Sequence, residues 1–134
     1  MKSPTHQSIL SVLFLLLFTF SFYFNTMAQK KQMVRLAKIK VDPSQLEKYE
    51  KALQKQMATA IRTEPGVITY YAVADKDNPS NITILEIYAD TAAYQSHIET
   101  AHFKKYKQTV KDMVVSLQLT DVSLIGVARK PDHD

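Results

Sequence analysis

The sequence ILEIYADTAAYQSHIETAHFKKY, residues 84–106, contains the end of a strand and two helix starts. Alternating side chains over residues 82–88 predict the strand. Asp90 then provides a cap for a short helix over residues 91–99, and Thr100 interrupts that helix before a second one begins. A strand carboxylate, three tyrosines and two histidines thus lie close together among apolar residues, so we expect part of a functional site here.

The residues before this sequence predict a strand, a helix and a second strand. Residues 33–41, MVRLAKIKV, alternate in the manner of a strand. Residues 42–45, DPSQ, combine a capping Asp, a Pro suited to the first helical position and a Gln placed for a capping box. An apolar stripe continues this helix to residue 61, and Glu64-Pro65-Gly66 ends it. The β-branched and aromatic residues at 67–74 predict the second strand.

The chain after residue 74 completes the pattern. A polar turn over residues 75–80 joins two strands into an antiparallel hairpin. The last helix has an apolar stripe formed by Phe103, Tyr106, Val110, Met113 and Val114. Residues 117–127 predict a closing strand, and residues 128–134 a loose tail. The order strand, helix, strand, strand, helix pair, strand predicts an α+β domain of the ferredoxin-like, split βαβ type.

Both faces of the predicted sheet are largely apolar. On the strand before Asp90, one face carries Ile82, Ile84 and Tyr88, and the other carries Thr83, Leu85 and Ile87. The helices cover one face, so the other face needs a second cover. We therefore expect a homodimer.

The first 28 residues predict an export signal rather than part of the fold. Lys2 precedes an almost wholly apolar run over residues 9–24, and the small residues Thr26 and Ala28 have the spacing that signal peptidase recognises. The run is shorter than the roughly 20 residues that cross a bilayer, so we expect no stable membrane anchor after signal removal. The mature protein would begin near Gln29 and would be secreted or periplasmic.

Composition excludes several classes of protein. Removal of residues 1–28 leaves a polar lead at 29–32 and a single domain at 33–127. The net charge of the 134-residue chain is +4 and its lysines are scattered, so we expect no nucleic-acid partner. The chain has no Cys, which excludes disulfides, thiolate nucleophiles and Cys-based zinc sites. It has two glycines, too few for a glycine-rich phosphate loop.

His97 is the first candidate for a functional group. On a helix it lies beside Ala93 and Tyr94, and an unperturbed pKa of about 6.5 lets it exchange protons at neutral pH. The alternative is a partly buried histidine bonded to a neighbouring backbone or tyrosine group. His102 lies about 140° further round an unbroken helix, so the pair is a poor metal site unless the break near Thr100 brings the rings together.

Glu86 is the second candidate, because a carboxylate among apolar neighbours must find a partner or raise its pKa. It could pair with Arg35, Arg62 or a lysine across the sheet, which would make it structural. Otherwise it is a base or an orienting acceptor in a pocket. Tyr70 and Tyr88 belong to the core or the interface, or aim a hydroxyl at a ligand.

These residues also carry a resemblance to a known family. The matching features are Glu64-Pro65-Gly66 before a tyrosine-bearing strand, a turn with Pro79, the sequence LEIY at 85–88 followed by Asp90 and Ala93, and the sequence HIETAHF at 97–103. Together they resemble the antibiotic biosynthesis monooxygenase (ABM) family, from about Met33 to Val127. The resemblance implies a dimeric α+β barrel.

The resemblance further implies an activity. Such enzymes oxidise a small aromatic, quinol or polyketide-like substrate with O₂ and no flavin, haem or metal cofactor, by removing a proton in an apolar pocket. His97 falls on the family's helix histidine and is the expected catalytic residue. Glu86 matches a recurrent strand glutamate. His102, Phe103, Tyr70 and Tyr88 are expected to bind the substrate.

Other functions stay open at the level of sequence. Haem-degrading relatives use a tryptophan that this chain lacks, so haem degradation is disfavoured. A relative with the same motifs isomerises a small sugar derivative. The main alternative to an enzyme is a secreted dimeric module that binds an aromatic or haem-like ligand without turnover, and a purely structural dimer is a third.

Overall fold

A computed structural model describes residues 31–128 and residue 130. The predicted signal peptide and most of the predicted tail lie outside the described residues. Among residues 31–128, no helix is long and apolar enough to span a membrane.

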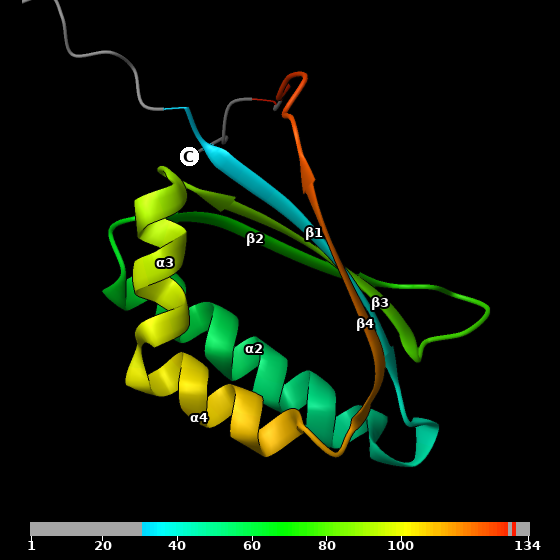
Figure 1. Cartoon of the computed structure of the whole chain (residues 1–134). Coiled ribbons are helices and arrows are strands. Elements are labelled where there is room, and N and C mark those ends of the chain that lie inside the picture. The colour runs from blue at the N-terminus through cyan, green and yellow to red at the C-terminus, as the bar shows by residue number, and fades with distance from the viewer. Residues whose placement is uncertain (1–30, 129, 131–134) are drawn as a thin grey trace, which may run out of the picture. The chain divides into compact units, whose positions relative to one another are not determined.

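The domain is an antiparallel four-stranded sheet in the order β2-β3-β1-β4, with three α-helices on one of its faces (Figure 1). The elements in chain order are β1 (Met33–Val41), the 3₁₀ turn η2 (Pro43–Gln45), α2 (Leu46–Thr63), β2 (Val67–Ala74), β3 (Asn81–Tyr88), α3 (Thr91–Glu99), α4 (Ala101–Val110) and β4 (Val114–Val122). This is the predicted ferredoxin-like α+β fold.

The end of the chain differs from the prediction. α4 ends at Val110, so Met113 and Val114 do not extend its apolar stripe. A turn over residues 111–113 leads directly into β4, where Val114 pairs with Val41. β4 therefore begins at Val114, three residues before the start of the predicted closing strand. It ends at Val122, five residues before the end of that predicted strand. The apolar spacing continued across the turn, which is why the helix was predicted too long.

The start of α2 also differs in one detail. The Asp42 carboxylate caps as predicted, accepting a hydrogen bond from the Ser44 backbone N–H. Gln45 does not complete a capping box, because its amide donates to the Asp112 carbonyl oxygen 3.1 Å away. This bond ties the start of α2 to the turn before β4.

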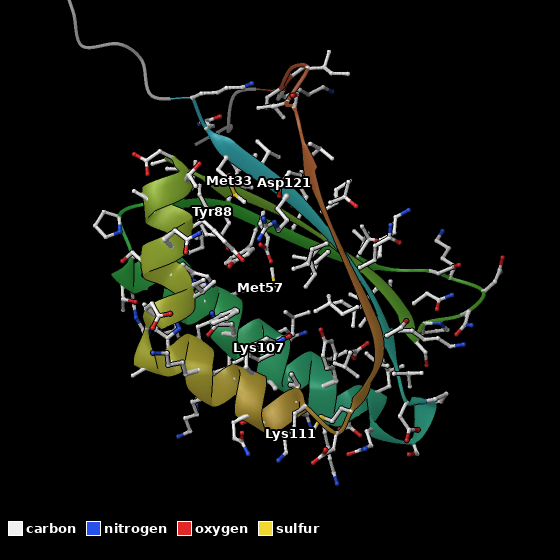
Figure 2. All side chains as sticks on the ribbon, viewed as in Figure 1. Met33, Met57, Tyr88, Lys107, Lys111 and Asp121 are labelled. Carbon is white, nitrogen blue, oxygen red and sulfur yellow. The ribbon has the colours of Figure 1, made fainter. Side chains whose placement is uncertain are left out.

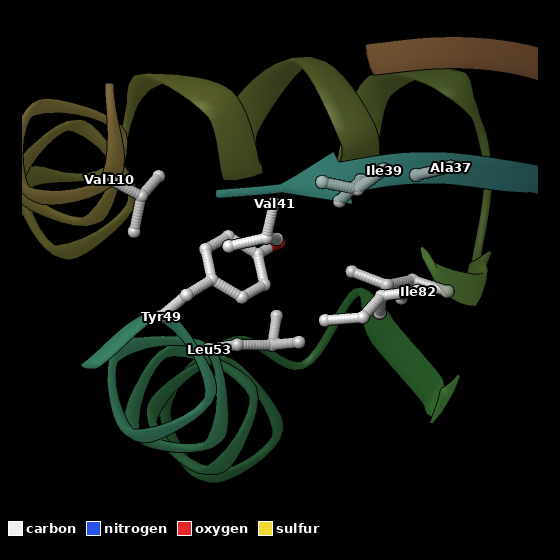
Figure 3. Packing of buried hydrophobic residues seen from close by; sticks show 8 residues of the cluster. Ala37, Ile39, Val41, Tyr49, Leu53, Ile82 and Val110 are labelled. Carbon is white, nitrogen blue, oxygen red and sulfur yellow. The ribbon is translucent and has the colours of Figure 1, made fainter. Parts of the chain in front are cut away.

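The core lies between the sheet and α2 and α4. Tyr49 and Leu53 on α2 and Val110 on α4 pack against β1 and β3 residues such as Ile39 and Ile82 (Figure 3). Tyr49 is fully buried and its hydroxyl lies 3.0 Å from the Tyr106 hydroxyl, so its one polar atom is hydrogen-bonded. Several residues of this cluster also form one wall of the cavity that contains the candidate site.

The register of the sheet brings three polar side chains together on the helix-covered face. Glu86 on β3 pairs with Arg35 on β1 and with Tyr70 on β2, so the three share a face. Tyr88 is two residues from Glu86 and lies on the same face. The central strand β3 therefore places a carboxylate and a phenol under α3.

Candidate active site

A cavity of about 100 Å³ lies between the helix-covered face of the sheet and the helices. Its lining includes five residues that the sequence singled out: Tyr70, Glu86, Tyr88, His97 and Phe103. Figure 2 shows Tyr88 from the sheet and Met57 from α2 both pointing into this space. His102 is not part of the lining, although it was predicted to contact the substrate.

The polar groups of the cavity form one continuous hydrogen-bonded chain. The Glu86 carboxylate lies 3.1 Å from the Tyr88 hydroxyl, which lies 2.8 Å from the Tyr70 hydroxyl. The Tyr70 hydroxyl lies 2.9 Å from His97 Nε2, and His97 Nδ1 lies 2.8 Å from Glu64 Oε1. The chain thus begins at a carboxylate in the cavity and ends at a second carboxylate where α2 ends.

The break at Thr100 brings the two histidine rings together. Thr100 caps α4, and its own backbone N–H donates to the His97 carbonyl oxygen. His102 Nε2 lies 2.8 Å from the same Glu64 oxygen as His97, but off the direction of a hydrogen bond, so this contact is electrostatic. Among residues 31–128, no three His, Asp or Glu side chains are placed to hold a metal ion.

Glu86 does not form the cross-sheet ion pair that would have made it structural. Arg35 instead contacts Asp121 at 2.7 Å and lies 4.2 Å from the centre of the Tyr94 ring. Burial raises the pKa of Glu86, and the Tyr88 hydrogen bond and the more distant Arg35 charge only partly oppose this effect. Glu86 is therefore a carboxyl group that takes a proton more readily than one in water.

Burial favours the neutral forms of Tyr70, Tyr88 and His97. Burial and the nearby Glu86 charge raise the pKa of Tyr70 and of Tyr88 far above that of a free phenol, so both stay protonated. Burial lowers the pKa of His97, and its bond to Glu64 opposes that change. His97 is 1% exposed and both of its ring nitrogens are bonded, so although the ring lines the cavity its nitrogens connect to a ligand there through Tyr70.

Glu86→Gln is expected to raise the free energy of unfolding at pH 7 by on the order of 1 kcal/mol. The raised pKa means that the fold disfavours the ionised carboxylate, so the stability of the wild type falls as pH rises above the unfolded value of about 4.3. The amide keeps an acceptor for Tyr88 without the charge. Urea unfolding at pH 4 and pH 7 checks this, and a variant no more stable than the wild type at pH 7 would contradict it.

Gln56 and Glu64 are site residues that the sequence interpretation missed. Gln56 is 6% exposed and lines the cavity; its oxygen accepts from His102 Nδ1, and its amide nitrogen has no hydrogen-bond partner among the described residues. A signal was present, because Gln56 lies between Leu53 and Ala60 on the buried stripe of α2. Glu64 was singled out as part of a helix end and of the family resemblance, but neither observation places its carboxylate beside His97.

The cavity opens along β4. Leu117 and Leu119 line it from the helix-covered face of β4 yet are 43% and 50% exposed. Lys107 on α4 is exposed and also lines the cavity. An aromatic ligand could therefore enter between an apolar strand and a cationic side chain, towards the buried polar chain.

Comparison with known proteins places this architecture in one family. The sequence profile of the antibiotic biosynthesis monooxygenases matches residues 33–109. No protein of curated function matches the chain. A solved structure from Bacteroides thetaiotaomicron VPI-5482, assigned as an antibiotic biosynthesis monooxygenase, is 50% identical with a TM-score of 0.72; the match covers 75% of this chain and 97% of that one.

Two further solved structures agree. A protein from Lactobacillus acidophilus NCFM, assigned as a monooxygenase, is 33% identical with a TM-score of 0.67, over 70% of this chain and 45% of that one. One from Caulobacter crescentus CB15 is 20% identical with a TM-score of 0.68, over 78% and 99% of the two chains, and shares the fold. The chain therefore belongs to the antibiotic biosynthesis monooxygenase family.

Proposed function

We propose that this protein is a monooxygenase that oxidises a small aromatic, quinol or polyketide-like substrate with O₂ and no cofactor. The observation that carries the proposal is the buried hydrogen-bonded chain from Glu86 in an apolar cavity to His97. Substrates of this class become reducing enough to react with O₂ when they lose a proton. The chain supplies groups that hold such a proton away from water.

The walls of the cavity suit a flat substrate. The ring centroids of Phe103 and His97 are 4.6 Å apart, and Tyr106 adds an aromatic surface 6.2 Å from Phe103. Rings in this arrangement can pack against a substrate ring. The volume of about 100 Å³ lies below the roughly 300–1,000 Å³ of pockets for drug-sized ligands and favours a small ring system over a porphyrin.

The reaction balances without an added reductant. A quinol and O₂ give a hydroxyquinone and water, and the substrate supplies all four electrons that reduce O₂. One oxygen atom enters the product and the other leaves as water. The residues of the cavity accept the substrate proton, orient the ring and exclude water. The Gln56 amide nitrogen is available to donate a hydrogen bond to the substrate oxyanion.

Oxygen uptake with a panel of quinols and dihydroxynaphthalenes tests this function. We expect protein-dependent uptake above the autoxidation blank, with a product formed in proportion. If no compound gives uptake but one of them raises the melting temperature, the protein is the binding module that was the alternative. Absence of both responses would contradict a site for this substrate class.

We further infer that the protein is exported and acts as a homodimer. The apolar run at residues 9–24 supports export. Tyr71 and Val73 on β2 lie on the face of the sheet opposite Tyr70, and Val73 is 63% exposed. A second copy that covers this face would bury them.

Val73→Asp is expected to convert the dimer to a monomer, because it would place an unpaired charge in a desolvated interface. Sedimentation velocity measures the change, and Lys55→Asp at an exposed position of α2 provides a control that should stay dimeric. A wild type that sediments as a monomer at every concentration would contradict the dimer.

A further inference from the structure

The hydrogen-bonded chain in the cavity needs more hydrogens than its neutral side chains and an ionised Glu86 can provide. Four links join Glu86, Tyr88, Tyr70, His97 and Glu64. Each link needs one hydrogen, whereas the two phenols and a neutral imidazole supply three. With Glu64 accepting from His97 Nδ1, the fourth hydrogen has to be an additional proton within the hydrogen-bonded chain.

Where Glu64 accepts from His97 Nδ1, that proton has two positions that satisfy every link. In one, Glu86 is a carboxylic acid that donates to Tyr88, and each following group donates towards Glu64. In the other, His97 is an imidazolium that donates both to Glu64 and to Tyr70, and the phenols donate back towards an ionised Glu86. The two arrangements differ by one proton passed along the chain, with each phenol giving one hydrogen and receiving another.

We propose that Glu86, Tyr88, Tyr70 and His97 form a relay for one mobile proton, in which Glu86 takes the proton from the bound substrate and Glu64 holds His97 ready to receive it. The proposal deepens the proposed function, and the substrate is of the same class, a phenol or quinol with an acidic O–H. When the chain holds three hydrogens, Glu86 is ionised and one link is unmade. This is the state that accepts a substrate proton.

Glu64 is the positioning residue of this relay. A carboxylate that accepts from His97 Nδ1 fixes the hydrogen of the neutral ring on that atom and leaves Nε2 free to accept from Tyr70. The side chain of Glu64 is 12% exposed and that of His102 is 25% exposed, whereas His97 is buried. The proton therefore leaves for solvent at Glu64 and His102, on the far side of His97 from the cavity.

The charged and titratable groups around the relay come from every neighbouring element. Around Glu86 and the two relay tyrosines they are Arg35, Tyr49, Tyr94, Tyr106 and, in the cavity lining, Lys107. Around His97 they are Glu64, Tyr70 and His102. Burial raises the pKa of Glu86 and lowers that of His97, so relative to the free groups in water it shifts the shared proton towards Glu86.

Nuclear magnetic resonance of the full domain without substrate tests the relay. The ¹⁵N shifts of His97 and the ¹³C shift of the Glu86 carboxyl carbon are followed from pH 4 to pH 9. We expect both groups to report the same two titration steps, because they share a proton. Tyr70→Phe removes the linking hydroxyl, so Glu86 and His97 should then no longer report the same steps.

Tyr106→Phe is the matched control, because it removes a cavity hydroxyl that bonds Tyr49 and lies outside the relay. The shared steps should survive it. If Tyr70→Phe does not fold, Tyr88→Phe makes the same cut. Independent single steps in the wild type, or shared steps that persist after either cut, would overturn the relay.

Glu64→Gln tests the positioning residue. The amide oxygen still accepts from His97 Nδ1, so the ring should keep its hydrogen there, while loss of the negative charge should lower the pKa of His97. Glu99 lies on α3 with His97 and forms an exposed ion pair with Lys104 on α4, so Glu99→Gln should change neither the position of the ring hydrogen nor the pKa of His97. An unchanged His97 pKa in Glu64→Gln would overturn the role of Glu64.

The spectra need no substrate, so they distinguish failure of the relay from failure of the proposed monooxygenase function. Independent titration in a protein that consumes O₂ would remove the relay and leave the monooxygenase. A shared proton in a protein that consumes no O₂ with any quinol would remove the activity and leave the relay as a property of the binding site.

Discussion

Replacing His97 with alanine is expected to lower kcat/KM about 10²- to 10⁴-fold, the usual contribution of a positioned proton-transfer group. His97 is the only member of the buried chain whose ordinary pKa lies near neutral pH, and its Nε2 lies 2.9 Å from the Tyr70 hydroxyl in the cavity. Without the ring, a proton taken from the substrate has nowhere to go beyond the two phenols. Oxygen uptake with the best quinol of the panel measures the loss.

Two variants make this result specific. His97→Gln keeps much of the bulk and the hydrogen-bonding capacity but cannot change protonation, so it should lose activity almost as fully. His102→Ala removes a ring that contacts Glu64 but does not line the cavity, so its loss should be clearly smaller. A folded His97→Ala protein with wild-type activity would exclude His97 from proton transfer.

Gly66→Ala is expected to destabilise the protein by about 1–3 kcal/mol, because the new methyl group overpacks a closed contact. A Cβ at Gly66 would lie 2.5 Å from the Cβ of Ala93, far inside van der Waals contact. Ala93 is on α3, the helix that carries His97, so relief of the contact moves the site as well. We therefore expect a lower midpoint of urea unfolding together with reduced oxygen uptake.

The second glycine and Ala93 provide controls for this effect. Gly126→Ala adds the same methyl group where nothing lies within 4 Å, so its stability should match that of the wild type. The double variant Gly66→Ala, Ala93→Gly removes the contact and should regain part of the stability, less about 1 kcal/mol for a glycine in a helix. Simple addition of the two single effects would show that the contact is not their cause.

The regular elements were predictable where apolar spacing and helix signals agree. β1, β2, β3 and α3 have the predicted bounds to within one residue, because a turn or capping residue closely follows each of them: Asp42, Asp75, Asp90 and Thr100. The prediction for α4 was too long, because Met113 and Val114 continue the helical spacing after the helix has ended. The spacing of apolar residues does not reveal this turn, because the turn depends on a distant contact: the Met113 carbonyl oxygen accepts a hydrogen bond from the Asp42 backbone N–H.

The candidate site was predictable in its residues but not in its connections. Single positions such as His97 and Glu86 stand out in the sequence as polar groups among apolar ones. The order in which Tyr88 and Tyr70 link them depends on the register of β2 against β3, which shifts between Val67 and Thr69 in a way that spacing does not reveal. Glu64 joins the hydrogen-bonded chain because α3 places His97 beside the end of α2. This tertiary contact is not visible in the local sequence.

The role of Gly66 shows the same limit. Its place after Pro65 predicts a residue needed for a sharp turn. Among the described residues no glycine has a positive φ, so backbone freedom is not what the position requires. The requirement comes from the approach of Ala93, and only the packed structure contains it.

The central claim, that one oxygen atom of O₂ enters the substrate, is tested most directly with ¹⁸O₂. The wild-type protein and an active quinol react under the labelled gas, and the product is analysed by mass spectrometry at once, together with hydrogen peroxide and total oxygen consumed. The account predicts one ¹⁸O atom per product, one O₂ consumed per turnover and no hydrogen peroxide. An unlabelled quinone with one equivalent of hydrogen peroxide would contradict it and identify an oxidase.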